Sequence, residues 1–205
     1  TELPKGFSVG KPAESGLIGE AVDASLLAWR NVGHAKARVA DEQVVADHAT
    51  ALLDVDLRLS PGPKLRFGPL TVEGEERMRE GRVRKIAGLP EGETFSETEL
   101  RRAESRLRRT GIFSSVTLAE DEQITDPDLL GVTATLVEQK PRRYSFGAEI
   151  ASLDGLSLEG SWLHRNLMGG GERLKVESAA TNIGSGQSGI DYSLGVSLDR
   201  PATIT

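Results

Sequence analysis

The segment Ile190-Asp191-Tyr192-Ser193-Leu194-Gly195-Val196-Ser197-Leu198-Asp199 alternates strictly between two kinds of residue. Its even-numbered residues are apolar or aromatic, and its odd-numbered residues are small or acidic. A period of two places each set on its own face of a β-strand. A tilted strand of about nine to eleven residues spans a bilayer, with an apolar face toward lipid and a polar face toward a water-filled lumen. The segment therefore predicts a membrane-spanning strand.

The same period occurs three more times before this segment, within residues 143–151, 156–162 and 174–178. We interpret residues 142–205 as the first four or so antiparallel strands of a transmembrane β-barrel, beginning with Arg142–Ala151. Tyr144 and Trp162 lie near strand ends, where they suit an interfacial aromatic girdle. Because the smallest such barrels need about eight strands, we expect a truncated barrel. An antiparallel sandwich has the same alternation and remains an alternative.

The composition of the chain changes after Pro141. Of the first 141 residues 43 are charged, against 13 of the last 64, which hold 10 of the 23 glycines. Fewer charges and more glycines favour strands joined by turns. A net charge of −6 argues against a protein that coats nucleic acid. The lack of cysteine excludes disulfides, thiolate metal sites and a cysteine nucleophile.

Before this boundary the sequence predicts two copies of one unit that mixes helices with strands, so the fold class is α+β. In both copies a helix ends on a glycine, Gly33 or Gly111, and passes directly into a strand. The copy in residues 64–141 has the order β-α-α-β-β, with strand 64–73, helices 75–87 and 96–110, and strands 113–118 and 130–138. The copy in residues 1–63 lacks the opening strand and consists of helix 17–30 and strands 35–45 and 51–60.

The second helix of residues 64–141 carries many arginines. Ser96 is its predicted N-cap, with Glu99 completing a capping box. The arginines suit a solvated face on which carboxylates four residues earlier pair with them; docking of this face on acidic lipid or a partner is the alternative. The predicted pairs are Glu97–Arg101 and Glu104–Arg108.

One long run of residues resembles a known family. Trp162-Leu163-His164-Arg165-Asn166-Leu167-Met168-Gly169-Gly170-Gly171-Glu172-Arg173-Leu174, together with Leu153–Gly160, resembles the start of the outer-membrane assembly barrel, and most of all its TamA-type autotransporter-assembly branch. The upstream copies resemble the POTRA domains of that family, and Gly111-Ile112-Phe113 resembles the opening of the second POTRA strand. This resemblance implies tandem POTRA domains (1–63 and 64–141) followed by a truncated barrel (142–205).

The resemblance implies an assembly factor that inserts outer-membrane β-barrel or autotransporter proteins and is not an enzyme. The first barrel strand is implied to form a weak seam, so that a client strand pairs with its backbone edge at Tyr144, Phe146, Ala148 and Ile150. The POTRA edge strands, about 35–45 and 113–118, offer similar pairing. A periplasmic turn motif is implied at Trp162, His164, Arg165, Asn166, Gly169, Gly170 and Gly171.

The partners that the resemblance implies are unfolded outer-membrane or autotransporter proteins, barrel-surrounding lipid and an inner-membrane-anchored protein. It implies a barrel in the bacterial outer membrane and POTRA domains in the periplasm. Neither nucleic acid nor any cofactor is implied. We expect no metal site, because His34, His48 and His164 lack ligand spacing.

Several alternatives stay open at this stage. A two-partner secretion porin also joins POTRA domains to a barrel but exports one dedicated partner, and a soluble hydrolase or binding protein with a β-sandwich is a third class. Gly169-Gly170-Gly171 is either a tight turn or a phosphate cradle. His164-Arg165-Asn166 either hydrogen-bonds the turn or binds lipid headgroups or a client. Finally, we expect unsatisfied strands in residues 142–205 to self-associate or to pack in an arrangement other than a barrel.

Overall fold

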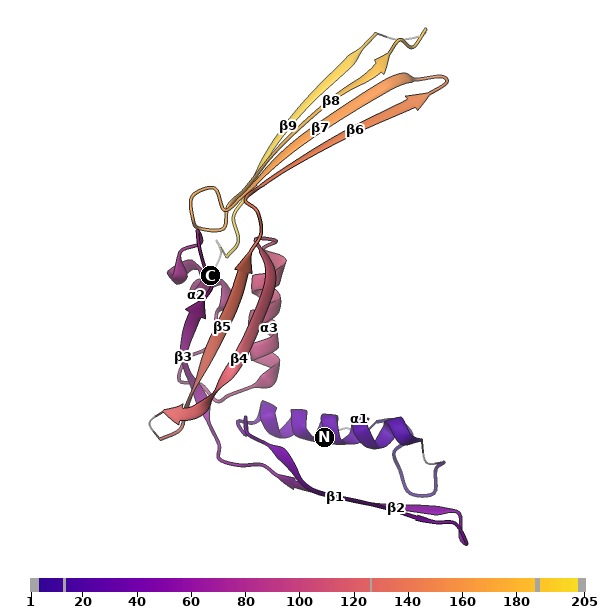
Figure 1. The fold of residues 1–205 in the computed structure, drawn as a ribbon, viewed down its shortest axis with the longest axis vertical. Helices are drawn as coiled ribbons and strands as arrows, with labels where there is room; N and C mark the ends of the chain where they lie inside the picture. The colour runs from indigo at the N-terminus through magenta and orange to yellow at the C-terminus, as the bar shows by residue number, and fades with distance from the viewer. Residues whose placement is uncertain (1–3, 13, 126, 187–188, 203–205) are drawn as a thin grey trace. The chain divides into compact units, whose positions relative to one another are not determined.

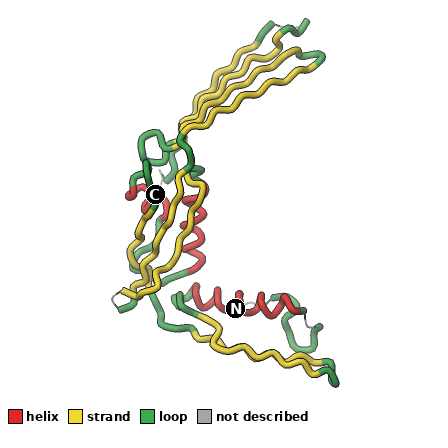
Figure 2. Tube along the Cα trace, in the orientation of Figure 1, coloured by secondary structure: helices red, strands yellow, loops and turns green. Residues whose placement is uncertain are grey.

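The structure is a computed structural model that describes residues 4–12, 14–125, 127–186 and 189–202 of the chain. The chain forms two units. The first contains Thr1–Thr71, Leu89–Arg102 and Leu118–Thr133, and the second contains Val72–Gly88, Ala103–Thr117 and Ala134–Thr205. Figure 1 labels the helices and strands, and Figure 2 separates them by colour.

The N-terminal part of the first unit is one helix and a β-hairpin (Figure 1). Helix α1 (Ser15–Asn31) precedes strands β1 (Arg38–Asp47) and β2 (Leu52–Ser60), which pair antiparallel. The predicted helix and both predicted strands are confirmed, with ends displaced by at most three residues. Gly33 follows the helix with a φ of 107°, a conformation that residues with a side chain rarely adopt.

A three-stranded sheet with two helices follows in the order that the sequence predicts, β-α-α-β-β. The strands lie in the order β3-β5-β4, so β3 and β4 are the sheet edges. All three strands run from one unit into the other, and each unit contains one end of the sheet. The elements are β3 (Arg66–Glu73), α2 (Glu80–Ala87), α3 (Glu97–Arg109), β4 (Phe113–Thr125) and β5 (Leu129–Glu138).

Each unit has buried apolar residues of its own. In the first unit the rings of Phe67 and Phe95 have centroids 5.0 Å apart, and Leu65, Leu100 and Leu130 are also buried. In the second unit the buried residues include Val83, Ile86, Leu107, Ile112, Val116 and Leu136. No helix in the described ranges is long and apolar enough to cross a membrane.

The predicted helix 75–87 is wrong over its first turn, because α2 begins only at Glu80. The backbone N–H groups of residues 76–78 donate instead to one carboxylate oxygen of Glu138, at 2.8–3.1 Å. Arg79 then has an extended backbone with a ψ of 129°. The carboxylate at the end of β5 therefore captures the donors and delays the helix. The helix ends as predicted at Gly88, which is left-handed.

The predicted N-cap of helix α3, Ser96, is confirmed, and Asn31 adds a second cap that the sequence did not indicate. The Ser96 hydroxyl accepts a long bond of 3.5 Å from the Glu99 N–H and donates to the Asn31 side-chain oxygen. That oxygen also accepts from the Thr98 N–H at 2.9 Å. The end of α1 therefore caps the start of α3 within the first unit. The following strand was predicted to end at residue 118, but β4 continues to Thr125.

The last four strands form one antiparallel sheet with the order β6-β7-β8-β9 (Figure 1). The first of the predicted strands, Arg142–Ala151, is confirmed with the predicted bounds. Because the strands pair with their neighbours in the chain, β6 and β9 are the two edges. The strands are β6 (Arg142–Ala151), β7 (Gly155–Arg165), β8 (Arg173–Ile183) and β9 (Asp191–Asp199).

Candidate functional site

The register of the four-stranded sheet gathers the apolar residues on one face. Tyr144 pairs with Trp162, which pairs with Val176, which pairs with Val196. Residues directly opposite one another share a face in antiparallel sheets, so each such row crosses the whole sheet. Three of the face's side chains are very exposed: Phe146 at 87%, Ile150 at 84% and Leu194 at 75%. The four strands thus present a continuous apolar surface.

The opposite face is polar. Ser161 pairs with Glu177, which pairs with Gly195, and the neighbouring row includes Lys175 and Ser197. The Lys175 ammonium lies 2.5 Å from the Glu177 carboxylate. An apolar face backed by a small and charged face is the pattern of a barrel wall between lipid and water.

Strand β6 is the edge strand that follows the β-α-α-β-β unit. The residues predicted to line client pairing, Tyr144, Phe146, Ala148 and Ile150, lie along it and all four are exposed. The structure brings them together on the apolar face. A Cβ added to Gly160, the register partner of Phe146, would lie 3.8 Å from that phenyl ring. The ring therefore covers the glycine and stabilises the pairing of β6 with β7.

The turn between β7 and β8 is built around a buried carboxylate. Glu172, 2% exposed, accepts hydrogen bonds from the N–H groups of Gly170 at 3.0 Å and Met168 at 3.3 Å. Burial opposes ionisation, but backbone hydrogen bonds and the charge of Arg200, 3.4 Å away, outweigh it and hold the pKa of Glu172 below its ordinary value. The carboxylate occupies the centre of the turn as an anion would.

The predicted turn residues contribute to this geometry in different ways. Asn166 has a φ of 59°, and its side-chain oxygen accepts from the Gly171 N–H at 3.0 Å. A Cβ at Gly170 would collide with the Glu172 carboxylate. The N–H groups of Gly170 and Gly171, which a phosphate would need, are already bonded within the chain, and the segment joins two strands. The phosphate interpretation is not supported.

Arginine side chains of the second unit hold the outside of the turn. Arg79 donates to the carbonyl of Met168 at 3.0 Å and that of Gly169 at 3.3 Å. Arg82 donates to the carbonyl of Gly170 at 3.0 Å and that of Pro201 at 2.7 Å. These two arginines were missed by sequence reasoning. Their partners lie about 90 or more residues away, so no local pattern could indicate them.

Arg165 connects the end of β7 to the segment before β6. Its side chain donates to the Gly111 carbonyl at 3.0 Å and the Lys140 carbonyl at 3.2 Å, and its N–H donates to the Pro141 carbonyl at 2.6 Å. Arg165 is therefore engaged by the chain's own carbonyls.

Trp162 and His164 lie two positions apart on β7 and therefore on the same face of the strand. Their rings are in edge contact with centroids 6.1 Å apart. Trp162 Nε1 and His164 Nδ1 are buried and have no hydrogen-bond partner in the described structure. Among all the residues that the structure describes, no three or more His, Asp or Glu side chains are grouped so that they could hold a metal ion.

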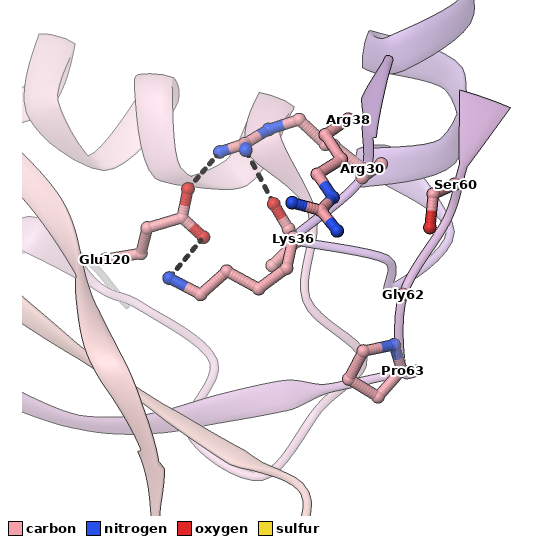
Figure 3. Close-up of a pocket in the computed structure, with 9 residues that line it drawn as sticks. Arg30, Lys36, Arg38, Ser60, Gly62, Pro63 and Glu120 are labelled. Atoms are coloured by element: carbon pink, nitrogen blue, oxygen red, sulfur yellow. Dashed lines mark hydrogen bonds and ion pairs between the residues drawn. The ribbon is translucent and has the colours of Figure 1, made fainter. Parts of the chain in front are cut away.

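A second concave site lies in the first unit, where α1 ends (Figure 3). Its volume is about 530 Å³, and its lining includes Lys36, Arg38 and Ser60. Arg30 donates to Glu97 at 2.7 Å and to Glu120 at 2.5 Å, and Lys36 donates to the Asp121 carbonyl at 2.7 Å. Most of these charges are satisfied by one another, so we interpret this site as a brace within the first unit.

The comparisons with known proteins agree with this architecture. The model of the POTRA family, described as a surface antigen variable number repeat, matches residues 65–139. The search of curated proteins finds no match.

Three solved structures have a similar fold. BamA from Haemophilus ducreyi lacking POTRA domains 1–3 is 19% identical with a TM-score of 0.72, over 85% of this chain and 33% of that one. POTRA domains 3–5 of Haemophilus influenzae BamA are 21% identical with a TM-score of 0.60, over 65% and 52%. CdiB from Escherichia coli is 16% identical with a TM-score of 0.57, over 94% and 34%.

The chain thus spans between a third and about half of the length of these structures. At such low identity they show the fold. The family match covers the β-α-α-β-β part, and the BamA and CdiB likenesses extend beyond it into the four-stranded sheet. Residues 65–139 therefore match the POTRA family, and together with β6–β9 the chain has a fold shared with the BamA and CdiB structures.

Proposed function

We propose that this chain is the POTRA–barrel junction of an outer-membrane assembly factor that inserts β-barrel or autotransporter clients. The observation that carries the proposal is the position of β6, the first strand of an amphipathic sheet, which directly follows the residues that match the POTRA family and whose outer edge the resemblance implies to be a weak seam. An exposed strand edge presents a row of free N–H and C=O groups to another chain. The resemblance of the Trp162–Leu174 run to the TamA-type branch supports the autotransporter variant of the proposal.

The proposed activity is strand addition. A client strand forms main-chain hydrogen bonds with β6, and its apolar side chains join the row of Tyr144, Phe146, Ala148 and Ile150. Main-chain pairing requires no particular sequence, which suits a factor with several clients. The POTRA edge β4 and the hairpin β1–β2 offer the same chemistry to clients before they reach the membrane. No covalent bond is made or broken, so the proposed activity needs neither a nucleotide nor a metal.

The proposed location follows from the two faces of the sheet. The apolar face contacts lipid of the bacterial outer membrane, and the polar face looks into the lumen. The POTRA domains then lie in the periplasm. There they meet unfolded outer-membrane or autotransporter proteins, and an inner-membrane-anchored partner protein remains part of the proposal.

A paired cysteine experiment in the full-length protein tests strand addition. The 205-residue chain has no cysteine; once any cysteine outside it is replaced by Ser, Ser145→Cys on β6 gives the full-length protein a single thiol. Its register partner Ser161 lies on the central strand β7, and Ser161→Cys is the matched control. Directly opposite Cβ atoms in a sheet are about 4.5–5.5 Å apart. We expect a stalled client strand carrying one cysteine to form a disulfide with Cys at 145 but not at 161. Equal yields at both positions would refute the proposal.

A two-partner secretion porin is the second candidate. CdiB, a porin of this class, covers more of the chain than BamA does, 94% against 85%, although with a lower TM-score. Client range separates the two functions. To test this, residues 1–205 replace the corresponding region of an assembly factor and of a secretion porin, and the proteins that reach the cell surface are identified. Several unrelated barrels at the surface support the assembly factor, and one dedicated exported partner supports the porin.

A further inference from the structure

Two arginines at the start of α2 donate hydrogen bonds to main-chain carbonyls at one end of the four-stranded sheet. We call Arg79 and Arg82 the arginine clasp. The Arg79 guanidinium and N–H reach the carbonyls of Met168 and Gly169, with the N–H bond at 3.0 Å. The Arg82 guanidinium bridges two separate segments, because it donates to Gly170 in the β7–β8 turn and to Pro201 after β9. One side chain thus joins three of the four strands through their ends.

The turn side of this contact is held by hydrogen bonds of its own, which do not involve the clasp. Glu172 and Asn166 take up the N–H groups of Met168, Gly170 and Gly171 from inside the turn. A Cβ at Gly169 would lie only 3.2 Å from the Arg77 carbonyl, so the main chains approach closely. The acceptor carbonyls are therefore held in place with little further loss of conformational entropy.

The helix side is ordered as well. The Glu138 carboxylate fixes residues 76–78, immediately before Arg79. Arg82 lies in the first turn of α2 and is partly buried in its bond to Pro201. Charged donors to main-chain acceptors form some of the stronger hydrogen bonds in proteins. The arginines and the carbonyls that they contact are therefore both held in place by hydrogen bonds outside the clasp.

We propose that the arginine clasp holds the sheet β6–β9 in one orientation on α2. Arg79 and Arg82 are thus positioning residues: they contact main-chain carbonyls of the turn and fix where the β6 edge lies relative to the second-unit part of the POTRA domain. The inference goes beyond the proposed function, because the clasp closes without any client. Exposed neighbours on α2 have no such role, since Arg84 pairs with Glu80 on the same helix.

Spin-label distances in the full-length protein test the clasp. Ser105 on α3 and Ser152 after β6 are exposed residues of the second unit. The 205-residue chain has no cysteine, so changing both to Cys provides two labelling sites once any cysteine outside it is replaced by Ser. Electron–electron double resonance then measures the distribution of distances between them. In the Arg79→Gln/Arg82→Gln variant we expect the distribution to broaden about twofold, as collective domain motion is released. Arg84→Gln is the matched control and leaves the distribution unchanged.

Arg82→Lys keeps the charge but has no planar fork to bridge two carbonyls. We expect an intermediate width, and this milder variant decides the matter if the double variant does not fold. Distributions as narrow as that of the unmodified protein in both variants would overturn the proposal, as would equal broadening in Arg84→Gln. The measurement is made without client, so a failed cysteine cross-link at Ser145 would leave this result standing.

Discussion

Glu138 shows how a single side chain sets the boundary of an element. The Glu138 side chain is 3% exposed, and its carboxylate accepts hydrogen bonds from three main-chain N–H groups. The residues that carry these N–H groups would otherwise form the first turn of the helix. Of these three donors only the Met78 N–H belongs to a buried residue, and a buried N–H that loses its acceptor costs about 1–3 kcal/mol. The start of α2, and with it the position of the arginine clasp, therefore depends on this one acid.

Replacing this acid provides a test at the residue scale. Glu138→Ala leaves three N–H groups without their acceptor, of which the Met78 N–H is the least accessible to water, and we expect the free energy of unfolding to fall by about 1–3 kcal/mol. Chemical denaturation followed by circular dichroism, in detergent, measures the change. Glu76→Ala is the control, because that side chain is well exposed and pairs only with Arg77 at 3.6 Å. Similar losses in the two variants would contradict the role assigned to Glu138.

Glycines of the β7–β8 turn provide a second test at this scale. A Cβ at Gly170 meets the buried Glu172 carboxylate, which cannot move without losing its backbone hydrogen bonds. Overpacking of this kind costs about 1–3 kcal/mol. We expect Gly170→Ala to lower the denaturation midpoint, whereas Gly195→Ala, with open space around its Cα, should not. A midpoint unchanged by Gly170→Ala would count against the turn geometry.

At the scale of elements, helix α3 combines local and distant pairing. The predicted ion pairs are confirmed: Glu97 bonds Arg101 at 2.9 Å, and Glu104 bonds Arg108. Pairs four residues apart are a property of the helix itself, which explains why they could be predicted. Arg30 of α1 adds a second cation to Glu97 within the first unit, which no helical spacing indicates. Most of the arginines are thus engaged, in line with a solvated face.

Glu97 makes the stability of the first unit depend on pH. Burial raises its pKa, but hydrogen bonds from Arg101 and Arg30 outweigh burial, so the pKa lies below its ordinary value. A carboxylate with a lowered pKa contributes stability above its unfolded-state pKa, and this is lost as the pH falls through the folded-state pKa. We expect Glu97→Gln to cost about 1–3 kcal/mol at neutral pH and progressively less below about pH 4. Urea unfolding of both proteins across this window measures it; a difference independent of pH would be the contrary result.

At the scale of the whole molecule, the open face of β6–β9 dominates behaviour in water. An apolar surface that extends across four strands and is exposed to water marks a site of association with lipid or protein. We therefore expect the 205-residue chain to self-associate without detergent and to be monomeric with it, as sedimentation velocity would show. The triple variant Phe146→Ser/Ile150→Ser/Leu194→Ser should shift the chain toward monomer.

A control variant tests whether the sheet face is responsible. Val32, Val44 and Leu52 are exposed apolar residues outside the sheet, and their replacement by Ser removes as many apolar side chains. We expect this variant to associate like the unmodified chain. A monomeric unmodified chain without detergent would show that the face is covered in some other way.

The amino-acid sequence by itself determined the type and order of most elements. Alternation with a period of two predicted β6–β9 and β2, and glycines after helices predicted the ends of α1, α2 and α3. These signals are local, because they depend on residues two to four positions apart. The glycine run and Asn166 were likewise recognisable as a turn from the chain segment alone.

Only the tertiary structure decided which residues meet across the chain. Arg82 and Pro201 are 119 positions apart, and Arg30 and Glu97 are 67 apart. The rows across the sheet, the carboxylate inside the turn, the delayed start of α2 and the cap from Asn31 are all of this kind. Such contacts depend on how strands register and units pack, which periodicity does not encode. Local preferences therefore determined the elements, and long-range packing decided the site.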